Sequence, residues 1–167
     1  VSTWLLTRGE DGLGNLIDDE YVEEDLTNVS RAKPSEHARH KGLLPSANKY
    51  LKRIKYGNGA HNVGDYYKFE MVVDYGDHDD TTPTPDRVTP LDWPCRQDPF
   101  SSFKAGFDMR TYRLCRRVLM FHHFTEIAAT PTLVRALELT YDHQKHMTKL
   151  SSATVKGFDV AGTPKPL

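Results

Sequence analysis

Residues 68–75 carry the pattern that most constrains what this chain can fold into. Apolar and polar side chains alternate along it with a period of two, with Phe69, Met71, Val73 and Tyr75 on one side and Lys68, Glu70, Val72 and Asp74 on the other. Such alternation predicts a β-strand with one buried and one wetted face. A chain built on strands of this kind must pair them into a sheet.

Further strand patterns run along the chain. Residues 4–8 and 16–22 flank an Asp-Gly-Leu-Gly-Asn turn and predict a β-hairpin, because Gly and Asn supply the positive φ that tight turns need. The other predicted strands are 48–56, 104–112, 114–124, 133–141 and a short one within 153–158. About seven strands and no long helix predict a mainly β fold of antiparallel strands and hairpins.

Two long segments interrupt the strands and are predicted to be loops. Residues from about 23 to 47 are polar and include few apolar side chains, which predicts an exposed loop. Residues from about 76 to 103 form a Pro-rich loop. Its Trp93, Phe100 and Phe103 are large apolar groups that a mobile loop would leave in water, so we expect residues 93–103 to be ordered by their burial.

The strand predicted at 114–124 is apolar on both faces. Val118 and Met120 point to one side, and Leu119 and Phe121 to the other. About seven strands with two long loops can cover one face of a sheet but hardly both. We therefore expect segments outside residues 1–167 to complete this core, and the isolated fragment to be oligomeric or prone to aggregate.

Length and charge exclude several classes of protein. The chain has 167 residues, one domain's worth, with 22 basic and 23 acidic residues and a net charge of −1. This balance predicts no nucleic-acid partner. No apolar run approaches the roughly 20 residues of a membrane-spanning helix, so we expect no direct membrane insertion. The chain begins at Val1 without a signal-peptide pattern.

Histidines, acids and cysteines supply candidate chemistry. Adjacent residues of a strand point to opposite faces, so His122 and His123 cannot easily bind one ion, and His143 and His146 would need a helical turn to converge. The acids Asp74, Asp77, Asp79 and Asp80 do not fit a calcium loop, which favours solvated loop acids. Cys95 and Cys115 could be bridged or free. No catalytic, cofactor-binding or metal-binding residue is predicted, and no cofactor.

Four arginines form a basic stretch around the same strand. Alternation places Arg113 and Arg117 on one face and Arg110 and Arg116 on the other. The group could face phosphates, but we favour cross-strand ion pairs with acids such as Asp108 or Glu70. Arg113, Arg116 and Arg117 are thus predicted to serve structure rather than anion recognition.

Several segments, taken together, resemble one family. They are Trp4-Leu5-Leu6 with the turn at 11–15, Ala47–Asn58, Phe69–His78 and Trp93–Phe124. The chain resembles the C-terminal half of the SpvB-like domain in the B component of insecticidal Tc toxin complexes. The resemblance covers residues 1 to about 124 in order and extends more loosely to 167.

The resemblance implies a non-catalytic structural segment of a secreted bacterial virulence toxin. In that family the B component joins a TcC-type Rhs subunit to form a β-shell around a toxic payload, and it docks on a TcA-type pore subunit. The expected partners are therefore other segments of the chain's own B subunit and, through the parent, these two subunits. The family's eponym also has an ADP-ribosyltransferase domain, but this sequence has no Glu-x-Glu or Gln-x-Glu pair for that chemistry.

Two other function classes stay open beside this one. A binding module could contact a host surface or a glycan through exposed aromatic residues and the loop at 76–94. An enzyme is the least favoured class, since no Gly-rich phosphate loop and no Gly-x-Ser-x-Gly elbow is present.

Overall fold

The fold is described from a computed structural model that covers residues 4–41, 48–59, 67–144 and 147–165. Ten strands are found in these ranges, with a 3₁₀ turn η1 (Pro34–Glu36) and a short helix α1 (His37–His40). The strands are β1 (Arg8–Glu10), β2 (Leu16–Glu23), β3 (Lys49–Asn58), β4 (Tyr67–Asp74), β5 (Phe100–Ser102), β6 (Met109–Thr111), β7 (Arg117–His122), β8 (Thr132–His143), β9 (Thr148–Phe158) and β10 (Pro164–Lys165).

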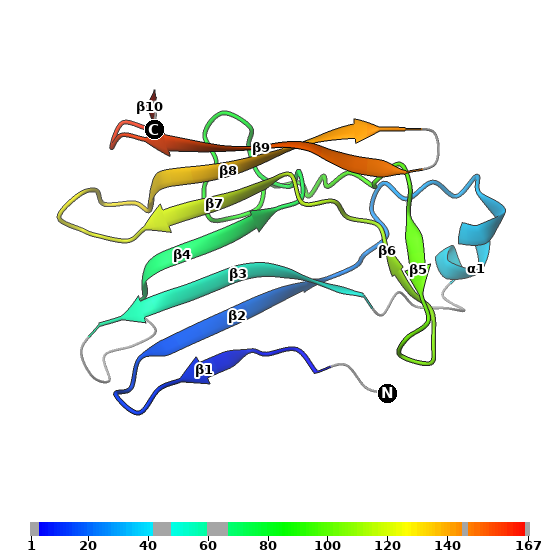
Figure 1. The fold of residues 1–167 in the computed structure, drawn as a ribbon, viewed down its shortest axis with the longest axis horizontal. Helices are drawn as coiled ribbons and strands as arrows, with labels where there is room; N and C mark the ends of the chain where they lie inside the picture. Colours follow the sequence, from blue (N-terminus) through cyan, green and yellow to red (C-terminus); the bar gives the residue numbers. More distant parts are fainter. Residues whose placement is uncertain (1–3, 42–47, 60–66, 145–146, 166–167) are drawn as a thin grey trace.

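Eight strands form one open antiparallel sheet in the order β1-β2-β3-β4-β7-β8-β9-β10 (Figure 1). Neighbours along the chain are neighbours in the sheet, except that β5 and β6 pair separately between β4 and β7. This hairpin crosses the end of the sheet where β3 begins (Figure 1). The prediction of a mainly β, antiparallel fold is confirmed.

Strand positions follow the sequence patterns closely in the middle of the sheet and less closely at its margins. The alternating segment at 68–75 is β4, which pairs with β3 and β7. The first strand begins only at Arg8, and the segment predicted at 104–112 is a strand only at 109–111. β9 begins at Thr148, before the predicted 153. Its first half is polar and exposed, so no apolar alternation indicated it.

The two faces of the sheet differ in chemistry. Cross-strand partners fix the faces, because Arg53, Val72, Leu119 and Ala136 lie in one row across four strands. Val72, Leu119, Phe121 and Ala136 are buried there and form a core. The segment 77–92 lies over this side, since Arg53 Nη2 donates to the Pro85 carbonyl at 2.8 Å. We call this side the covered face.

The opposite side is apolar and only partly covered. We call it the apolar face, and its members are Ile17, Ile54, Tyr56, Phe69, Met71, Val118, Met120, Leu137 and Val155. All nine side chains are half-buried or exposed, with Ile17 49% and Val155 52% exposed. Gly57 has a φ of 72°, and a Cβ there would lie 2.6 Å from the Phe69 ring. Glycine is therefore required where this ring packs flat on β3.

A second core closes the end of the sheet beside the hairpin. Tyr50, Val73, Tyr75 and Trp93 are buried together, and the Trp93 ring meets Tyr50 edge-on at 5.9 Å. The expectation that the 93–103 segment is ordered by burial holds for Trp93 and is wrong for two other rings. Phe100 and Phe103 are exposed, because residues 100–102 form strand β5 of the projecting hairpin rather than a packed loop.

The segment predicted as an exposed loop at about 23–47 has a buried part. Residues 42–47 lie outside the described residues. Glu24, Val29 and Glu36 are buried, which corrects the expectation of exposure at these positions. Their partners are distant in sequence, since Glu36 accepts a hydrogen bond from the Tyr112 hydroxyl and Glu24 pairs with Arg113. These contacts satisfy buried carboxylates that a local pattern cannot pair.

Candidate functional site

A buried ionic cluster fixes residues 24–29 to the end of the sheet. Arg113 Nε donates to Glu24 Oε2 at 2.9 Å, and its two terminal nitrogens donate to the carbonyls of Trp93 and Thr27 at 2.8 and 2.9 Å. The guanidinium lies 4.0 Å above the Trp93 ring. All hydrogen-bonding directions of Arg113 point inward, so this arginine stabilises structure and offers nothing to a ligand.

A second buried cluster joins the start of segment 77–92 to β3. Lys52 Nζ lies 2.9 and 2.8 Å from the two oxygens of Asp77, and Arg87 Nε donates to Asp77 at 2.6 Å. Burial opposes the charge of Asp77, but Lys52 outweighs it and holds the pKa of Asp77 below its usual range. Burial likewise lowers the pKa of Lys52. Asp74 is also buried, so the solvated-acid interpretation fails for Asp74 and Asp77.

The remaining arginines of the basic stretch divide between structure and solvent. Arg117 Nε pairs with Asp74 at 2.6 Å across β7 and β4, which is the kind of cross-strand pair expected. The partners named as examples are wrong, because Asp108 pairs with Arg39 and Glu70 with Arg53. Arg110 pairs with Glu36. Arg116 is exposed.

The paired histidines point apart, as strand geometry requires. The His122 ring packs edge-on against Phe69 on the apolar face, whereas His123 Nε2 lies 2.8 Å from Glu70 Oε2 on the opposite side. His143 Nδ1 is 3.2 Å from the Thr148 hydroxyl, and His146 lies outside the described residues. Within the described ranges, no group of three or more His, Cys, Asp and Glu side chains is arranged to hold a metal ion.

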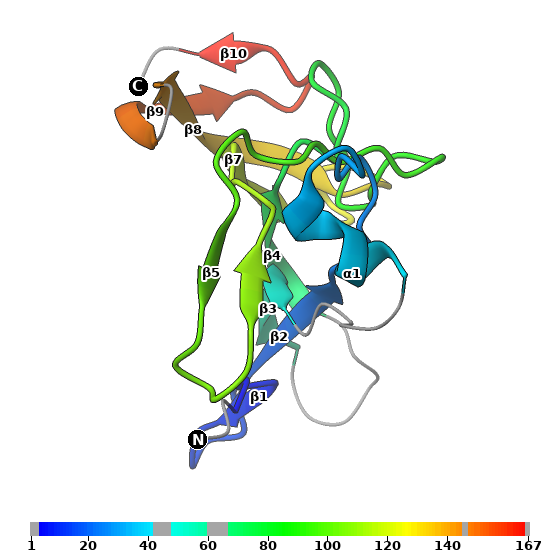
Figure 2. The ribbon, with the colours of Figure 1, turned by 90° about the vertical axis from the view of Figure 1, so that its right-hand side faces the viewer.

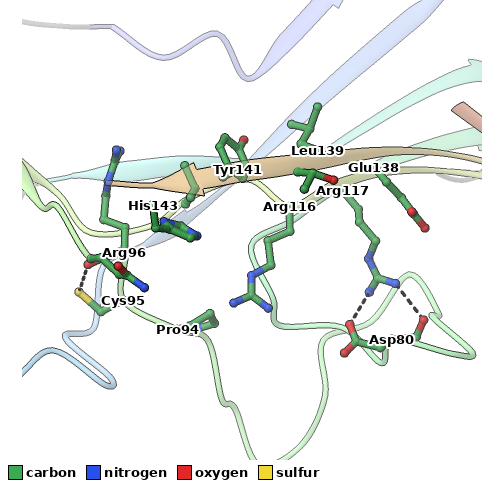
Figure 3. A pocket seen from close by; sticks show the side chains of 13 residues that line it. Asp80, Pro94, Cys95, Arg96, Arg116, Arg117, Glu138, Leu139, Tyr141 and His143 are labelled. Atoms are coloured by element: carbon green, nitrogen blue, oxygen red, sulfur yellow. Dashed lines mark hydrogen bonds and ion pairs between the residues drawn. The ribbon is translucent and has the colours of Figure 1, made fainter. Parts of the chain in front are cut away.

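Figure 3 shows a pocket of about 410 Å³ into which the Arg116 side chain extends beside Pro94. We call it the Arg116 pocket. Around it, Arg96 pairs with Asp98 and Arg117 with Asp74 and Asp80. The Cys95 thiol donates to the Arg96 carbonyl, and burial raises the pKa of this thiol. A protonated, internally bonded thiol is a poor nucleophile, so Cys95 is not activated for attack.

A second pocket of about 590 Å³ lies over the covered face and is lined by Arg53, Lys55 and Glu70 among others. Its charged groups are already engaged with one another, because Lys55 pairs with Glu20 and Arg53 with Asp86. We call it the Arg53 pocket.

Cys95 and Cys115 are both free and half-buried. Among the described residues no helix is long and apolar enough to span a membrane.

An exposed apolar surface remains among the described residues. It consists of the apolar face and of the β5–β6 hairpin, whose Phe100, Phe103 and Phe107 are exposed. Strand alternation located β4, but the prediction of one buried and one wetted side is wrong for this strand. Glu70, Val72 and Asp74, which were predicted to be wetted, are buried on the covered face, whereas Phe69 and Met71 are only half-buried. The hairpin aromatics were missed as surface residues, because composition alone cannot distinguish a buried ring from an exposed one.

Family comparison identifies the type of chain. The family described as "SpvB: Salmonella virulence plasmid 65kDa B protein" matches residues 1–124. The mono(ADP-ribosyl)transferases SpvB of Salmonella typhimurium (strain 14028s / SGSC 2262) and Salmonella choleraesuis (strain SC-B67) are each 34% identical over 174 residues. The match covers 97% of this chain and 29% of each relative. The chain therefore spans less than a third of proteins named for transferase activity.

Solved structures show the same sheet in two settings. The N-terminal domain of effector protein SpvB from Salmonella typhimurium strain LT2 matches with a TM-score of 0.78 at 33% identity, over 93% of this chain and 51% of that one. The TcdB2-TccC3-Cdc42 crystal structure and the Photorhabdus luminescens Tc holotoxin pore each match with a TM-score of 0.80 at 30% identity, over 97% of this chain and 8% of theirs. By fold and by sequence, this chain belongs to the SpvB family.

Proposed function

We propose that this chain is a non-catalytic wall segment of a secreted toxin subunit, contributing to a β-shell that encloses a toxic payload and helps to deliver it. One observation carries the proposal. An open sheet of eight strands has one face covered by the chain's own segment 77–92, while the apolar face has no complete cover among the described residues.

The apolar face extends across most of the sheet. Its nine members lie on six adjacent strands from β2 to β9, and the row of Ile54, Met71 and Met120 ends in Asp19 on β2 and in the exposed Arg135 on β8. Contiguous apolar patches beyond a few hundred Å² mark interaction surfaces. A second layer packed about 10 Å away would remove these side chains from water and complete the core. In the two Tc toxin structures the part that matches residues 1–167 is 8% of a much longer chain. This supports a parent protein large enough to supply the second layer.

Absence of catalysis is the second part of the proposal. The relatives are named as transferases, but only 29% of their length matches this chain, and the sequence lacks the paired acids of that chemistry. The matched SpvB structure is an N-terminal domain. The buried charges of this chain are engaged in pairs that hold the fold, as Arg113 and Lys52 illustrate.

We further propose that the partners are those of the parent complex. Other segments of the chain's own subunit would cover the apolar face, and a TcC-type Rhs subunit and a TcA-type pore subunit would be reached through the parent, outside the producing cell. Solved neighbours that include a TcdB2-TccC3 complex and a Tc holotoxin pore support this. A host-surface or glycan site in the 76–94 loop is less favoured, because its Trp93 is buried.

Thiol accessibility in the full-length protein tests the proposal. Val155→Cys places a thiol on the apolar face, and Thr154→Cys places one on the opposite side of the same strand, where both native residues are exposed. In the assembled protein we expect a bulky maleimide to label position 154 at least tenfold faster than position 155. Cys95 and Cys115 are replaced by Ser in both variants. Equal labelling of the two positions would contradict a covered apolar face.

A further inference from the structure

The β5–β6 hairpin is anchored to the body along β6 and at the adjoining Asp108 by several independent contacts. Arg110 pairs with the buried Glu36 at 2.9 Å, and Asp108 pairs with Arg39. The Asn48 amide donates to the Arg110 carbonyl at 3.2 Å. A free two-stranded hairpin is marginally stable. These anchors therefore hold the hairpin in one position next to α1, and Figure 2 shows it running alongside the sheet.

The fixed hairpin presents aromatic rings to water. Phe103 is 68% exposed and Phe107 52% exposed in the connecting loop, and Phe100 at the start of β5 is 51% exposed. Phe100 has a partner within the chain, because the Arg96 guanidinium lies 4.7 Å from its ring. Between Phe103 and Phe107 the loop holds only one charged residue, Lys104. Rigidly held aromatic side chains are the usual anchors of protein interfaces, since little entropy is lost when they dock.

We propose that the hairpin tip inserts Phe103 and Phe107 into an apolar recess formed by another segment of the same polypeptide, outside residues 1–167. This inference rests on the proposed function only in placing the chain within a longer protein. The matched SpvB N-terminal domain has about as much chain again beyond the matched part, and the full relatives have more. A tip with a single charge suits an apolar recess better than a charged partner.

Two other occupants fit the structure less well. The Arg116 pocket and the Arg53 pocket are poor acceptors for the tip of a second copy, because both are lined by charged side chains. The apolar face is proposed above to be covered within the parent, and the cross-link below distinguishes a second copy docked there. A lipid surface would need basic residues around the aromatics, and the loop offers Lys104 alone in a chain of net charge −1. The geometry therefore favours docking within the parent polypeptide.

Photo-cross-linking of the full-length protein tests this docking. The photoreactive residue p-benzoylphenylalanine replaces Phe103 in one variant and Ser152 in a control, because Ser152 is exposed in the middle of β9. We expect position 103 to give an intramolecular cross-link to a segment beyond residues 1–167, at least fivefold above the control. A yield equal to the control would overturn the proposal. So would a cross-link only between two copies, or only to phosphatidylserine-containing vesicles added to the sample.

A paired substitution gives a second readout. Phe103→Ser with Phe107→Ser removes both rings without disturbing the base of the hairpin, so the fold of residues 1–167 is retained. We expect trypsin to cut the full-length double variant after Lys104 at least tenfold faster than the wild type, with Ser102→Ala as a control that keeps Lys104 and both rings. Equal cleavage of both variants would mean that the tip is free in the parent. The thiol comparison at positions 154 and 155 is independent of these outcomes, so either proposal can fail alone.

Discussion

Replacing Trp93 should produce the largest loss of stability of any single substitution at the closed end of the sheet. The side chain is 0% exposed and meets two tyrosine rings edge-on, Tyr50 at 5.9 Å and Tyr75 at 6.5 Å. The guanidinium of Arg113 lies over its ring, and its indole N–H donates to Asp25 at 2.9 Å. Truncating a fully buried Trp to Ala costs about 3–5 kcal/mol. We expect Trp93→Ala to fall near the upper end, because the aromatic and cation–π contacts add to the cavity.

The second tryptophan of the chain provides a matched control. Trp4 is 91% exposed, so Trp4→Ala should change the free energy of unfolding by less than about 0.5 kcal/mol. It also leaves Trp93 as the single fluorophore, which makes urea unfolding followed by tryptophan emission specific to the core. The Trp93→Ala variant is followed by circular dichroism under the same conditions. If the two variants unfold within about 1 kcal/mol of each other, Trp93 does not hold the loop to the sheet.

Two further predictions concern the buried charges. Arg113→Gln should lower the free energy of unfolding by about 3–5 kcal/mol, because it leaves the buried Glu24 carboxylate without its cation. Arg116→Gln, at an exposed position, should lower it by less than about 0.5 kcal/mol. Similar urea midpoints for the two variants would refute the structural role of Arg113. Burial, with Lys52 nearby, lowers the pKa of His78, so the unfolded chain binds a proton that the folded chain excludes. Stability should therefore fall as pH drops below about 6.5, and this slope should flatten in His78→Gln but not in the exposed control His37→Gln.

Local sequence patterns predicted where the central strands lie, but they did not predict which charged groups are buried at the closed end of the sheet. Period-two alternation located β4 and β3, but it predicted Val72 and Asp74 to be wetted and both are 0% exposed, whereas Phe69 and Met71 are only half-buried. The segment 77–92 lies over the side that carries Val72, and a strand pattern does not contain that cover. Glu24 and Arg113 are 89 residues apart, and no local pattern predicts that a carboxylate in a polar segment will be buried by so distant a cation. The structural role of Arg113 was predicted from the net charge of the chain and from strand alternation, but its partner Glu24 was not predicted.

Contacts between distant segments also decide which apolar side chains remain at the surface. A strand with apolar residues on both sides, such as β7, predicted that the sheet needs cover on two faces, and the structure supplies cover on one. The path of the chain after Pro99 decides which aromatic rings face water, because β5 pairs with β6 outside the main sheet. Sequence could therefore indicate that apolar surface would remain, but only the fold shows that it gathers on the apolar face and at the hairpin tip.

The described residues bury several charged side chains and expose several apolar ones. Arg113, Lys52 and their acidic partners are buried, while Phe103, Phe107 and Val155 are exposed. Buried ion pairs contribute little net stability compared with apolar packing, but they tolerate almost no displacement once both charges leave water. They fix the loops at one end of the sheet in a single arrangement. Apolar surface left outside is then available to pack against the rest of a larger protein.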